Sequence, residues 1–327
     1  MQGAPVVPTP NIKDRTVTLP QTYIGVDVAK DWIDVCDPAS SRQERIPTDR
    51  RSLRSFAATV GSSIVVLEAS GGYERPVMSA LFEAGRLATC VNPRQAREFA
   101  RATGRLAKSD RVDALVLVEM GRALQLAPAS PRSAERQRLS ELTAHRAGIT
   151  TMIVAEKNRL RTAQDPWIRR NISQHIKTLQ ASLAKAEAEM EAVIQGQGDL
   201  REQAARLRQV KGIGPVVSAT LIAQLPELGQ LDRRRIAALA GLAPHANGSG
   251  HRRGKRSIWG GRGTIRRTLY LAALTASRFD PRFRAFKERL LAAGKAKKPV
   301  IVACARKLLT VLNAMIKTGT AYRDAIV

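Results

Sequence analysis

Three kinds of residue are scarce in this chain of 327 residues. Aromatic side chains make up 4% of it, Asp and Glu number 28 against 54 Lys and Arg, and there are only three cysteines, Cys36, Cys90 and Cys304. An odd number of widely spaced cysteines argues against a disulfide framework and against a C-x-x-C zinc site. We interpret the cysteines as reduced core residues. With so few aromatics, the sequence offers few side chains on which a flat ring could stack.

We also find no long apolar run and no signal sequence, which would begin with charged residues followed by an apolar stretch. No run approaches the roughly 18 apolar residues of a spanning helix. We therefore expect no membrane partner and a cytoplasmic location. The hydrophobic content of 44% fits a globular protein long enough for more than one domain.

Positive charge is what the sequence has in excess. The net charge is +26, and residues 245–300 hold 15 Lys or Arg against 2 Asp or Glu, whereas residues 21–122 hold 15 against 13. A concentrated basic segment is typical of a phosphate-facing surface, and nucleic acid is the first candidate partner. A solvated basic helix face is the alternative.

The order of patterns predicts an α/β domain over residues 21–128, after a flexible tail at 1–20. Two β-branched runs in "TYIGVDVAKDWIDVCD" and the run "QERIPT" predict three strands. Helical and strand patterns then alternate from "SLRSFAATV" to "RQAREFARATG". Three strands followed by this alternation is the order of a ribonuclease H-like fold, although other α/β sheets share it.

Four carboxylates stand where such a fold could bring them together. Asp27 and Glu68 end predicted strands, and Asp110 and Asp113 are three residues apart at the start of a helix. Four converging carboxylates would repel one another without a cation, and oxygen ligands suit Mg²⁺, so two-metal phosphate chemistry is the natural use. Helix capping and a favourable macrodipole are the structural alternatives for Asp110 and Asp113.

Residues 129–200 follow a helical period in two blocks. Apolar positions recur at spacings of three and four on either side of Asp165-Pro166, where proline ends the first helix. We expect a helical hairpin or coiled coil that projects and dimerises. Two amphipathic helices packed on their own domain are the alternative, and the polar Arg146 and Glu156 interrupt the first seam.

The remaining residues, 201–327, predict a mainly helical domain with two candidate nucleic-acid motifs. "VKGIGPVVSATLIAQL" resembles a helix-hairpin-helix, in which Gly212 and Gly214 would let the backbone approach a phosphate. A plain helix-turn-helix packing unit would need the same glycines. Downstream, Ser249 stands between two glycines in a segment with many cations that could stabilise phosphoryl oxygens, namely Arg252, Arg253, Lys255, Arg256, Arg262, Arg266 and Arg267.

Seven motifs together resemble a known family in order and spacing. They are "YIGVDVAK", "VVLEASGGYERPV", "VNPRQAREFA", "KSDRVDA", "VKGIGPVVSATLIAQL", "ALAGLAPHANGSG" and "GGRGTIRRTLYLAAL". The chain resembles, over residues 22–320, the DEDD-type insertion-sequence transposases of family one-hundred-ten. This resemblance implies a RuvC-like N-terminal domain, a coiled-coil connector and a C-terminal transposase domain. Asp27, Glu68, Asp110 and Asp113 match the family's acidic, metal-binding set, and Ser249 matches its nucleophile.

The resemblance also implies an activity and its partners. Members join donor and target DNA through a serine-linked DNA intermediate, under the direction of a bridge RNA, as dimers that pair into a tetramer in the bacterial cytosol. From the local residues alone, Ser249 could equally be a turn residue in a phosphate-binding loop. Two further classes therefore stay open: a RuvC-like nuclease that hydrolyses DNA with water, and a non-enzymatic nucleic-acid scaffold.

Overall fold

The computed structural model describes residues 22–105, 110–131, 133–245, 248–249, 252–253 and 257–322, without the side chains of 110–112, 248–249 and 252–253. The predicted tail at 1–20 lies outside this range. The chain divides into two compact units, Met1–Pro131 and Arg132–Val327. We describe each unit by itself.

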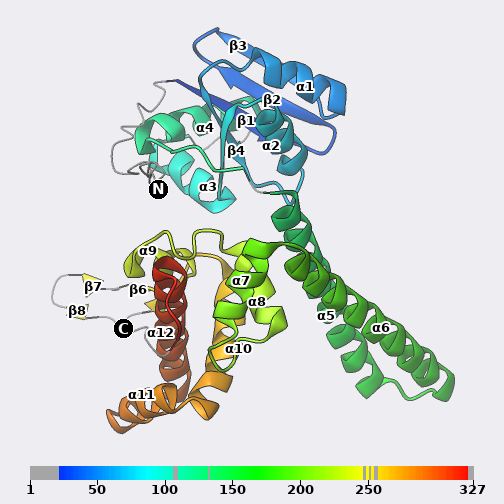
Figure 1. The fold of residues 1–327 in the computed structure, drawn as a ribbon. Helices are drawn as coiled ribbons and strands as arrows, with labels where there is room; N and C mark the ends of the chain where they lie inside the picture. Colours follow the sequence, from blue (N-terminus) through cyan, green and yellow to red (C-terminus); the bar gives the residue numbers. More distant parts are fainter. Residues whose placement is uncertain are drawn as a thin grey trace, which may run out of the picture. The chain divides into compact units, whose positions relative to one another are not determined.

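The first unit is a five-stranded sheet with helices on both faces (Figure 1). Its elements in chain order are β1 (Tyr23–Val28), β2 (Trp32–Asp37), β3 (Arg42–Pro47), α1 (Arg50–Thr59), β4 (Ile64–Glu68), α2 (Glu74–Glu83), β5 (Leu87–Val91), α3 (Pro93–Ala102) and α4 (Asp110–Leu124). Each strand and helix predicted between residues 21 and 122 is present. The α/β class of this region is thereby confirmed.

The sheet is mixed, with strand order β3-β2-β1-β4-β5. β1, β2 and β3 pair antiparallel, whereas β4 runs parallel to β1 and β5 parallel to β4. The antiparallel part has short turns, and the parallel part needs helical crossovers, which α1 and α2 supply. β1 and β4 therefore lie side by side, and their carboxyl ends share one edge of the sheet.

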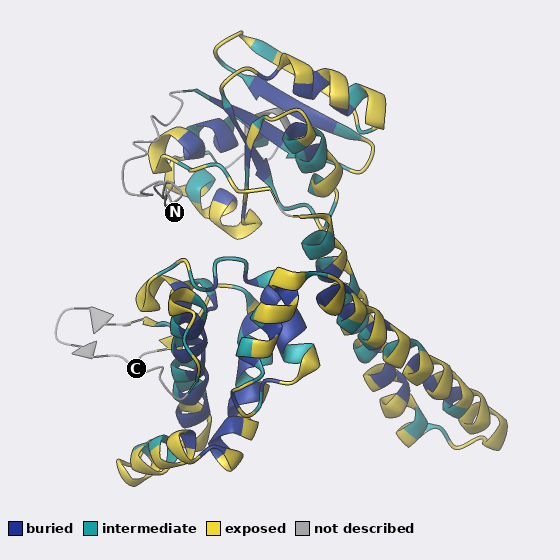
Figure 2. Ribbon diagram, viewed as in Figure 1, coloured by how far each residue is buried: buried dark blue, intermediate teal, exposed yellow. Residues whose placement is uncertain are grey.

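Both faces of the central strands β2, β1 and β4 are buried, as Figure 2 shows. Ile24 and Val26 of β1 pack with α1 and α2, while Tyr23 packs with α3 and α4 on the other side. Cys36 lies on this second face and is buried, but Cys90 on the edge strand β5 is exposed. Our assignment of Cys90 to the core is wrong, because an edge strand leaves alternate side chains to solvent.

Helix α4 lies unusually close to β1. A Cβ on Gly25 would come within 1.8 Å of the Ala114 carbonyl oxygen, and one on Gly121 within 2.6 Å of the Tyr23 ring. Only hydrogen fits at either position. These two glycines therefore set how near α4, with its acidic N-terminal turn, approaches the first strand.

In its described residues, the second unit is helical apart from two short β-ribbons. Its elements are α5 (Ala134–Thr162), α6 (Pro166–Gly196), α7 (Gly198–Leu207), α8 (Pro215–Gln224), α9 (Arg233–Leu239), β6 (Pro244–His245), β7 (Gly248–Ser249), β8 (Arg252–Arg253), β9 (Ser257–Ile258), α10 (Gly263–Phe279), α11 (Pro281–Ala292) and α12 (Lys297–Thr318). The mainly helical character predicted for this region is confirmed.

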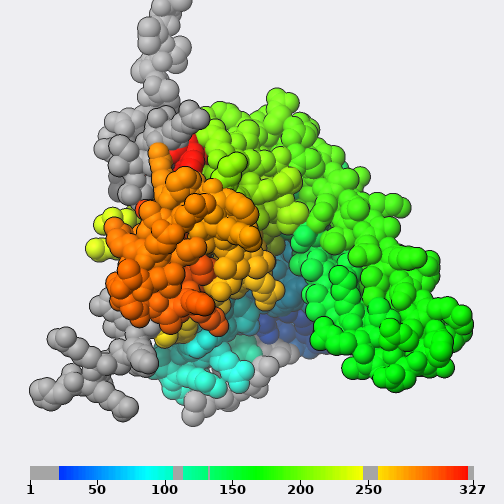
Figure 3. All heavy atoms as spheres, turned by 90° about the horizontal axis from the view of Figure 1, so that it is seen from below, coloured from blue at the N-terminus to red at the C-terminus, as the bar shows by residue number. Residues whose placement is uncertain are grey.

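Helices α5 and α6 form an antiparallel hairpin (Figure 1), and its atoms extend from this unit in the space-filling view (Figure 3). Its outer seam contains Ile149, Ile153, Leu179 and Ala186. The two polar positions that interrupt the predicted period find partners: Arg146 pairs with Glu187 at 2.7 Å, and buried Glu156 accepts from Arg159 at 2.9 Å. The hairpin is confirmed, while its dimerisation stays a prediction.

Helix α12 is the central core helix of the second unit. Ten of its residues are buried, among them Cys304, and it packs against α7, α9, α10 and α11. By its length of 22 residues and its mean hydropathy of 1.6, this helix is long and apolar enough to cross a membrane. We missed this run in the sequence. However, 56% of the apolar window is buried inside the unit, as expected for a core helix.

Candidate functional site

Two predicted carboxylates lie at the ends of neighbouring parallel strands. β1 and β4 pair from Tyr23↔Ile64 to Val26↔Leu67, so Asp27 and Glu68 are the next residues on each strand. Tyr23 and Ile64 belong to the face covered by α3 and α4, and the period of two places Asp27 and Glu68 on that same face. Both side chains are half-buried. One Asp27 carboxylate oxygen accepts the Val28 amide at 3.0 Å.

The close contact at Gly25 positions the third carboxylate. Asp113 directly precedes Ala114, whose carbonyl meets Gly25, two residues before Asp27 on β1. Asp110 is the first residue of α4, and its side chain lies outside the described residues. The fold thus brings Asp27, Glu68 and the start of α4 to one edge of one face of the sheet.

These residues are all oxygen donors, which is the chemistry that Mg²⁺ prefers. Among the described side chains, no group of three or more His, Cys, Asp or Glu could hold a metal ion. Asp110 is not among those side chains. The side chains of Asp27, Glu68 and Asp113 therefore do not form a metal-binding group by themselves in this structure.

One more carboxylate, which we did not predict, lies beside Asp27. Asp34 on β2 is the direct cross-strand partner of Asp27 and is only 8% exposed. Its two oxygens accept from the Arg45 guanidinium at 2.9 and 2.8 Å, and that guanidinium lies 4.6 Å from the centroid of the Trp32 ring. Arg45 neutralises Asp34 and so limits the repulsion between two neighbouring carboxylates. The sequence did not single out Asp34, because a polar residue at this position is expected in a strand that alternates apolar and polar side chains.

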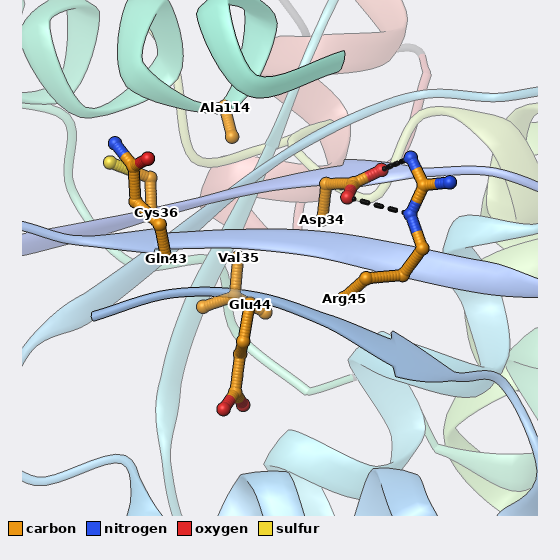
Figure 4. Close-up of a pocket in the computed structure, with 7 residues that line it drawn as sticks. All are labelled: Asp34, Val35, Cys36, Gln43, Glu44, Arg45 and Ala114. Carbon is orange, nitrogen blue, oxygen red and sulfur yellow. Dashed lines mark hydrogen bonds and ion pairs between the residues drawn. The ribbon is translucent and has the colours of Figure 1, made fainter.

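A pocket of about 390 Å³ adjoins this ion pair. Figure 4 shows Asp34, Arg45 and Cys36 beside Ala114 of α4, with the dashed lines marking the Asp34–Arg45 bonds. Burial raises the pKa of the Cys36 thiol, so this cysteine is a poor nucleophile at neutral pH.

Ser249 lies on a short β-ribbon in the second unit. β7 pairs antiparallel with β8, so that Ser249 is opposite Arg252 and Gly248 opposite Arg253. The ribbon places the backbone of one predicted cation directly across from the predicted nucleophile. The Ser249 side chain, and the whole of Lys255 and Arg256, lie outside the described residues.

A second ribbon pairs β6, which comes before that segment in the chain, with β9, which comes after it. Pro244 pairs with Ile258 and His245 with Ser257. The ring of His245 lies 5.4 Å from that of Trp259, which is 49% exposed. Sequence reasoning missed this aromatic pair. The available signal in the sequence was a tryptophan within the most basic segment.

A tight glycine contact fixes the chain after Trp259. Gly260 and Gly261 have φ of 70° and 61°, and a Cβ on Gly261 would come within 2.2 Å of the Gly241 nitrogen. Arg266 donates to the Gly260 carbonyl at 2.6 Å. Arg266 therefore has a structural task in holding this turn.

Two other predicted cations differ in their environment. Arg262 makes two bonds of 2.6 Å to Glu227 and one of 2.9 Å to the Gln224 carbonyl, so most of its donors are used within the protein. Arg267 is exposed on α10. Of these two, Arg267 is the better placed for an external phosphate.

The two glycines of the predicted helix-hairpin-helix differ in how closely they are packed. Gly212 has φ of 94°, and a Cβ there would come within 2.4 Å of the Ala272 carbonyl on α10, so packing alone requires this glycine. Gly214 is exposed at the N-terminus of α8, with nothing near an added Cβ. Phosphate contact stays a prediction for both.

Comparison with known protein families agrees with these features. A model of DEDD-type IS110 proteins, described as "Transposase", matches residues 24–165, and one described as "Transposase IS116/IS110/IS902 family" matches residues 204–288. The chain belongs to the IS110 family of transposases. The family indicates an enzyme that recombines DNA.

Two relatives of this IS110 transposase match most of the chain. It is 25% identical to the pilin gene-inverting protein of Moraxella bovis over 94% of this chain and 99% of the relative, and 24% identical to that of Moraxella lacunata over the same shares. It is also 32% identical to a probable family 20 transposase of Pseudomonas aeruginosa, over 47% of this chain and 46% of the relative.

Proposed function

We propose that this IS110 transposase is an RNA-guided DNA recombinase that cuts and rejoins donor and target DNA through a Ser249–DNA ester. The observation that supports this most is the placement of Asp27, Glu68 and the start of α4 at one edge of the sheet. Together with the strand order, it supports a RuvC-like first unit. The proposal includes a bridge RNA as guide, action on DNA in the cytosol, and an active complex in which dimers pair into a tetramer.

The roles of the residues follow from their chemistry. Asp27, Glu68, Asp110 and Asp113 would hold Mg²⁺, which when bound supplies electrostatic stabilisation of a phosphate under attack. Ser249 supplies the attacking oxygen. Arg252, opposite it on β8, and the neighbouring cations Arg253, Lys255, Arg256 and Arg267 would bind phosphate oxygens.

A serine ester explains how DNA can be rejoined without an energy source. Attack by the Ser249 oxygen on phosphorus forms a P–O bond and releases the 3′ or 5′ hydroxyl of the cut strand. Attack by a second DNA hydroxyl then displaces serine and restores a phosphodiester, with its proton replacing the one that serine lost. Hydrolysis by water would not conserve the bond.

Denaturing electrophoresis of a recombination reaction tests this proposal. Incubation of the protein with end-labelled target DNA, donor DNA and guide RNA should give a DNA-linked protein band that protease removes. Ser249→Ala should lose both this band and the recombinant product. Ser257→Ala, in the same basic segment, is the matched control and should retain both. Recombination by Ser249→Ala would overturn the serine mechanism and leave Ser249 as a turn residue in a phosphate-binding loop.

A further inference from the structure

The free end of the α5–α6 hairpin exposes a tryptophan. Trp167 follows Pro166 in the first turn of α6 and is 66% exposed, more than any other large apolar side chain in the described part of the chain. The next residue, Ile168, is 42% exposed. A large aromatic held in water on a regular helix is typical of a contact surface.

Trp167 is not needed to build the tip. The Asp165 carboxylate caps α6 by accepting the Ile168 amide at 2.9 Å, and Arg169 donates to the carbonyls of Leu160 and Ala163 at 3.0 and 2.8 Å. Ile172, one turn further along α6, is buried in the hairpin. The geometry of the tip thus rests on other residues, and the indole is available for an external partner.

Positive charge surrounds this indole. Residues 157–170 contain five Lys or Arg and one Asp, a net charge of +4. All five cations are exposed. Arg159 is paired with Glu156, and Arg169 is used by the two carbonyls. Within the described residues no salt bridge involves Lys157, Arg161 or Arg170.

Arg170 is the cation best placed to act with the indole. It lies three residues after Trp167, so the two side chains emerge from the same side of α6. A partner that reaches the indole therefore also meets a guanidinium.

This combination favours nucleic acid over a second copy of the chain. A two-fold contact between two tips would bring +4 against +4, which opposes association. A single strand of nucleic acid instead offers phosphates to the cations and the flat face of a base to the indole. Duplex DNA offers the phosphates without an accessible base face.

We propose that the tip of the α5–α6 hairpin, residues 157–170, binds an unpaired stretch of nucleic acid. Trp167 stacks on one base, and Lys157, Arg161 and Arg170 contact flanking phosphates. This contact goes beyond the proposed function, since it involves neither the carboxylates nor Ser249. Its test therefore needs no cleavage, and loss of recombination in other variants leaves it unaffected.

Tryptophan fluorescence of the full chain tests the contact. The chain has three tryptophans. In a Trp259→Phe background the emission comes from exposed Trp167 and from Trp32, which the Arg45 guanidinium covers. A short single-stranded oligonucleotide, supplied as DNA in one arm and as RNA in the other, should quench Trp167 and distinguish the two sources. A duplex of the same sequence should quench far less.

Charge variants separate this contact from the rest of the basic protein. In the same background, Arg161→Gln with Arg170→Gln should raise the Kd measured by quenching at least about 5-fold and reduce the slope of log K against log salt by about 1.4, or about 0.7 per phosphate contact. Arg138→Gln is the matched control, because Arg138 is an exposed cation of the same hairpin that already pairs with Glu189 at 2.7 Å. It should change neither quantity.

Four outcomes would overturn the proposal. They are no quenching by either oligonucleotide, equal quenching by duplex, an unchanged Kd in the double variant, and quenching by anionic phosphatidylserine vesicles in place of oligonucleotide. Sedimentation of the chain without nucleic acid completes the test. A shift to a lower oligomeric state on Trp167→Ala would assign the tip to a second copy of the chain.

Discussion

Gly25 is the residue whose side chain, a single hydrogen, decides how α4 meets the sheet. We expect Gly25→Ala to destabilise the first unit by about 1–3 kcal/mol or more, because the added methyl would overlap the Ala114 carbonyl. Urea unfolding followed by Trp32 fluorescence, with Trp167 and Trp259 replaced by Phe, measures this unit alone. Gly61→Ala is the control, since nothing lies within 4 Å of its added Cβ. Equal midpoints for both variants would contradict the predicted contact.

Arg45 gives a second prediction at the residue scale. Arg45→Gln leaves the buried Asp34 carboxylate without its charge partner beside Asp27, and we expect it to cost about 1–3 kcal/mol of unfolding free energy. Arg54→Gln should cost less than about 0.5 kcal/mol, because the Arg54–Glu83 pair is exposed and 3.7 Å long. The same unfolding assay compares them. If Arg45→Gln lowers the unfolding free energy no more than Arg54→Gln does, the fold does not depend on the Asp34–Arg45 ion pair.

At the scale of elements, Arg208 joins α6 to α8. Its guanidinium donates to both oxygens of Glu191 at 2.8 and 2.6 Å and to the Ser218 hydroxyl at 2.9 Å. These hydrogen bonds hold the pKa of Glu191 below its usual 4.5. A carboxyl with a lowered folded-state pKa stabilises the fold above its unfolded pKa and loses that stabilisation as the pH falls.

We therefore expect Arg208→Gln to lower the unfolding free energy by about 1–2 kcal/mol at neutral pH. The difference from the unaltered protein should shrink as the pH falls below 4.5, where Glu191 becomes protonated. Unfolding followed by far-UV circular dichroism across this range measures it. A difference that stays constant with pH would assign the loss to packing and not to the charge of Glu191.

The elements that the sequence predicted are those with a long, regular period. β-branched runs identified β1, β2 and β4, and the break at Asp165-Pro166 separated α5 from α6. The two ribbons around Ser249 were not predicted, because strands of two residues carry no period. Their pairing depends on turns and on contacts such as that between Gly241 and Gly261.

Only part of the candidate site could likewise be predicted from the sequence. Strand-end carboxylates could be located, since a parallel pair of strands aligns its ends by register. The closeness of α4 to β1 could not be inferred, because a glycine inside a strand pattern does not say which element it meets. Asp34 was missed for a related reason: its burial depends on Arg45, eleven residues away on the next strand.

At the scale of the whole molecule, charge is segregated along the chain. Residues 245–300 carry a net +13, against +2 for residues 21–122. We expect Arg252→Gln with Arg253→Gln to lower the slope of log K against log salt for duplex DNA by about 0.9 for each phosphate that these arginines neutralise. Arg50→Gln with Arg51→Gln, in the first unit, should leave the slope unchanged. Titrations at several salt concentrations decide between them, and equal slopes for both pairs would mean that the charge map does not predict where DNA binds.

Helix α12 has a consequence for how the protein is made. Residues 297–318 leave the ribosome after α7, α9, α10 and α11, yet all four pack on this helix. The first unit contains its own sheet and core, and can fold while synthesis continues. The segment that carries Ser249 emerges earlier than the helix that completes its core. A nascent chain interrupted before residue 297 therefore has a complete first unit but lacks the helix on which α7, α9, α10 and α11 pack, so we expect the core of the second unit to assemble only after α12 has been made.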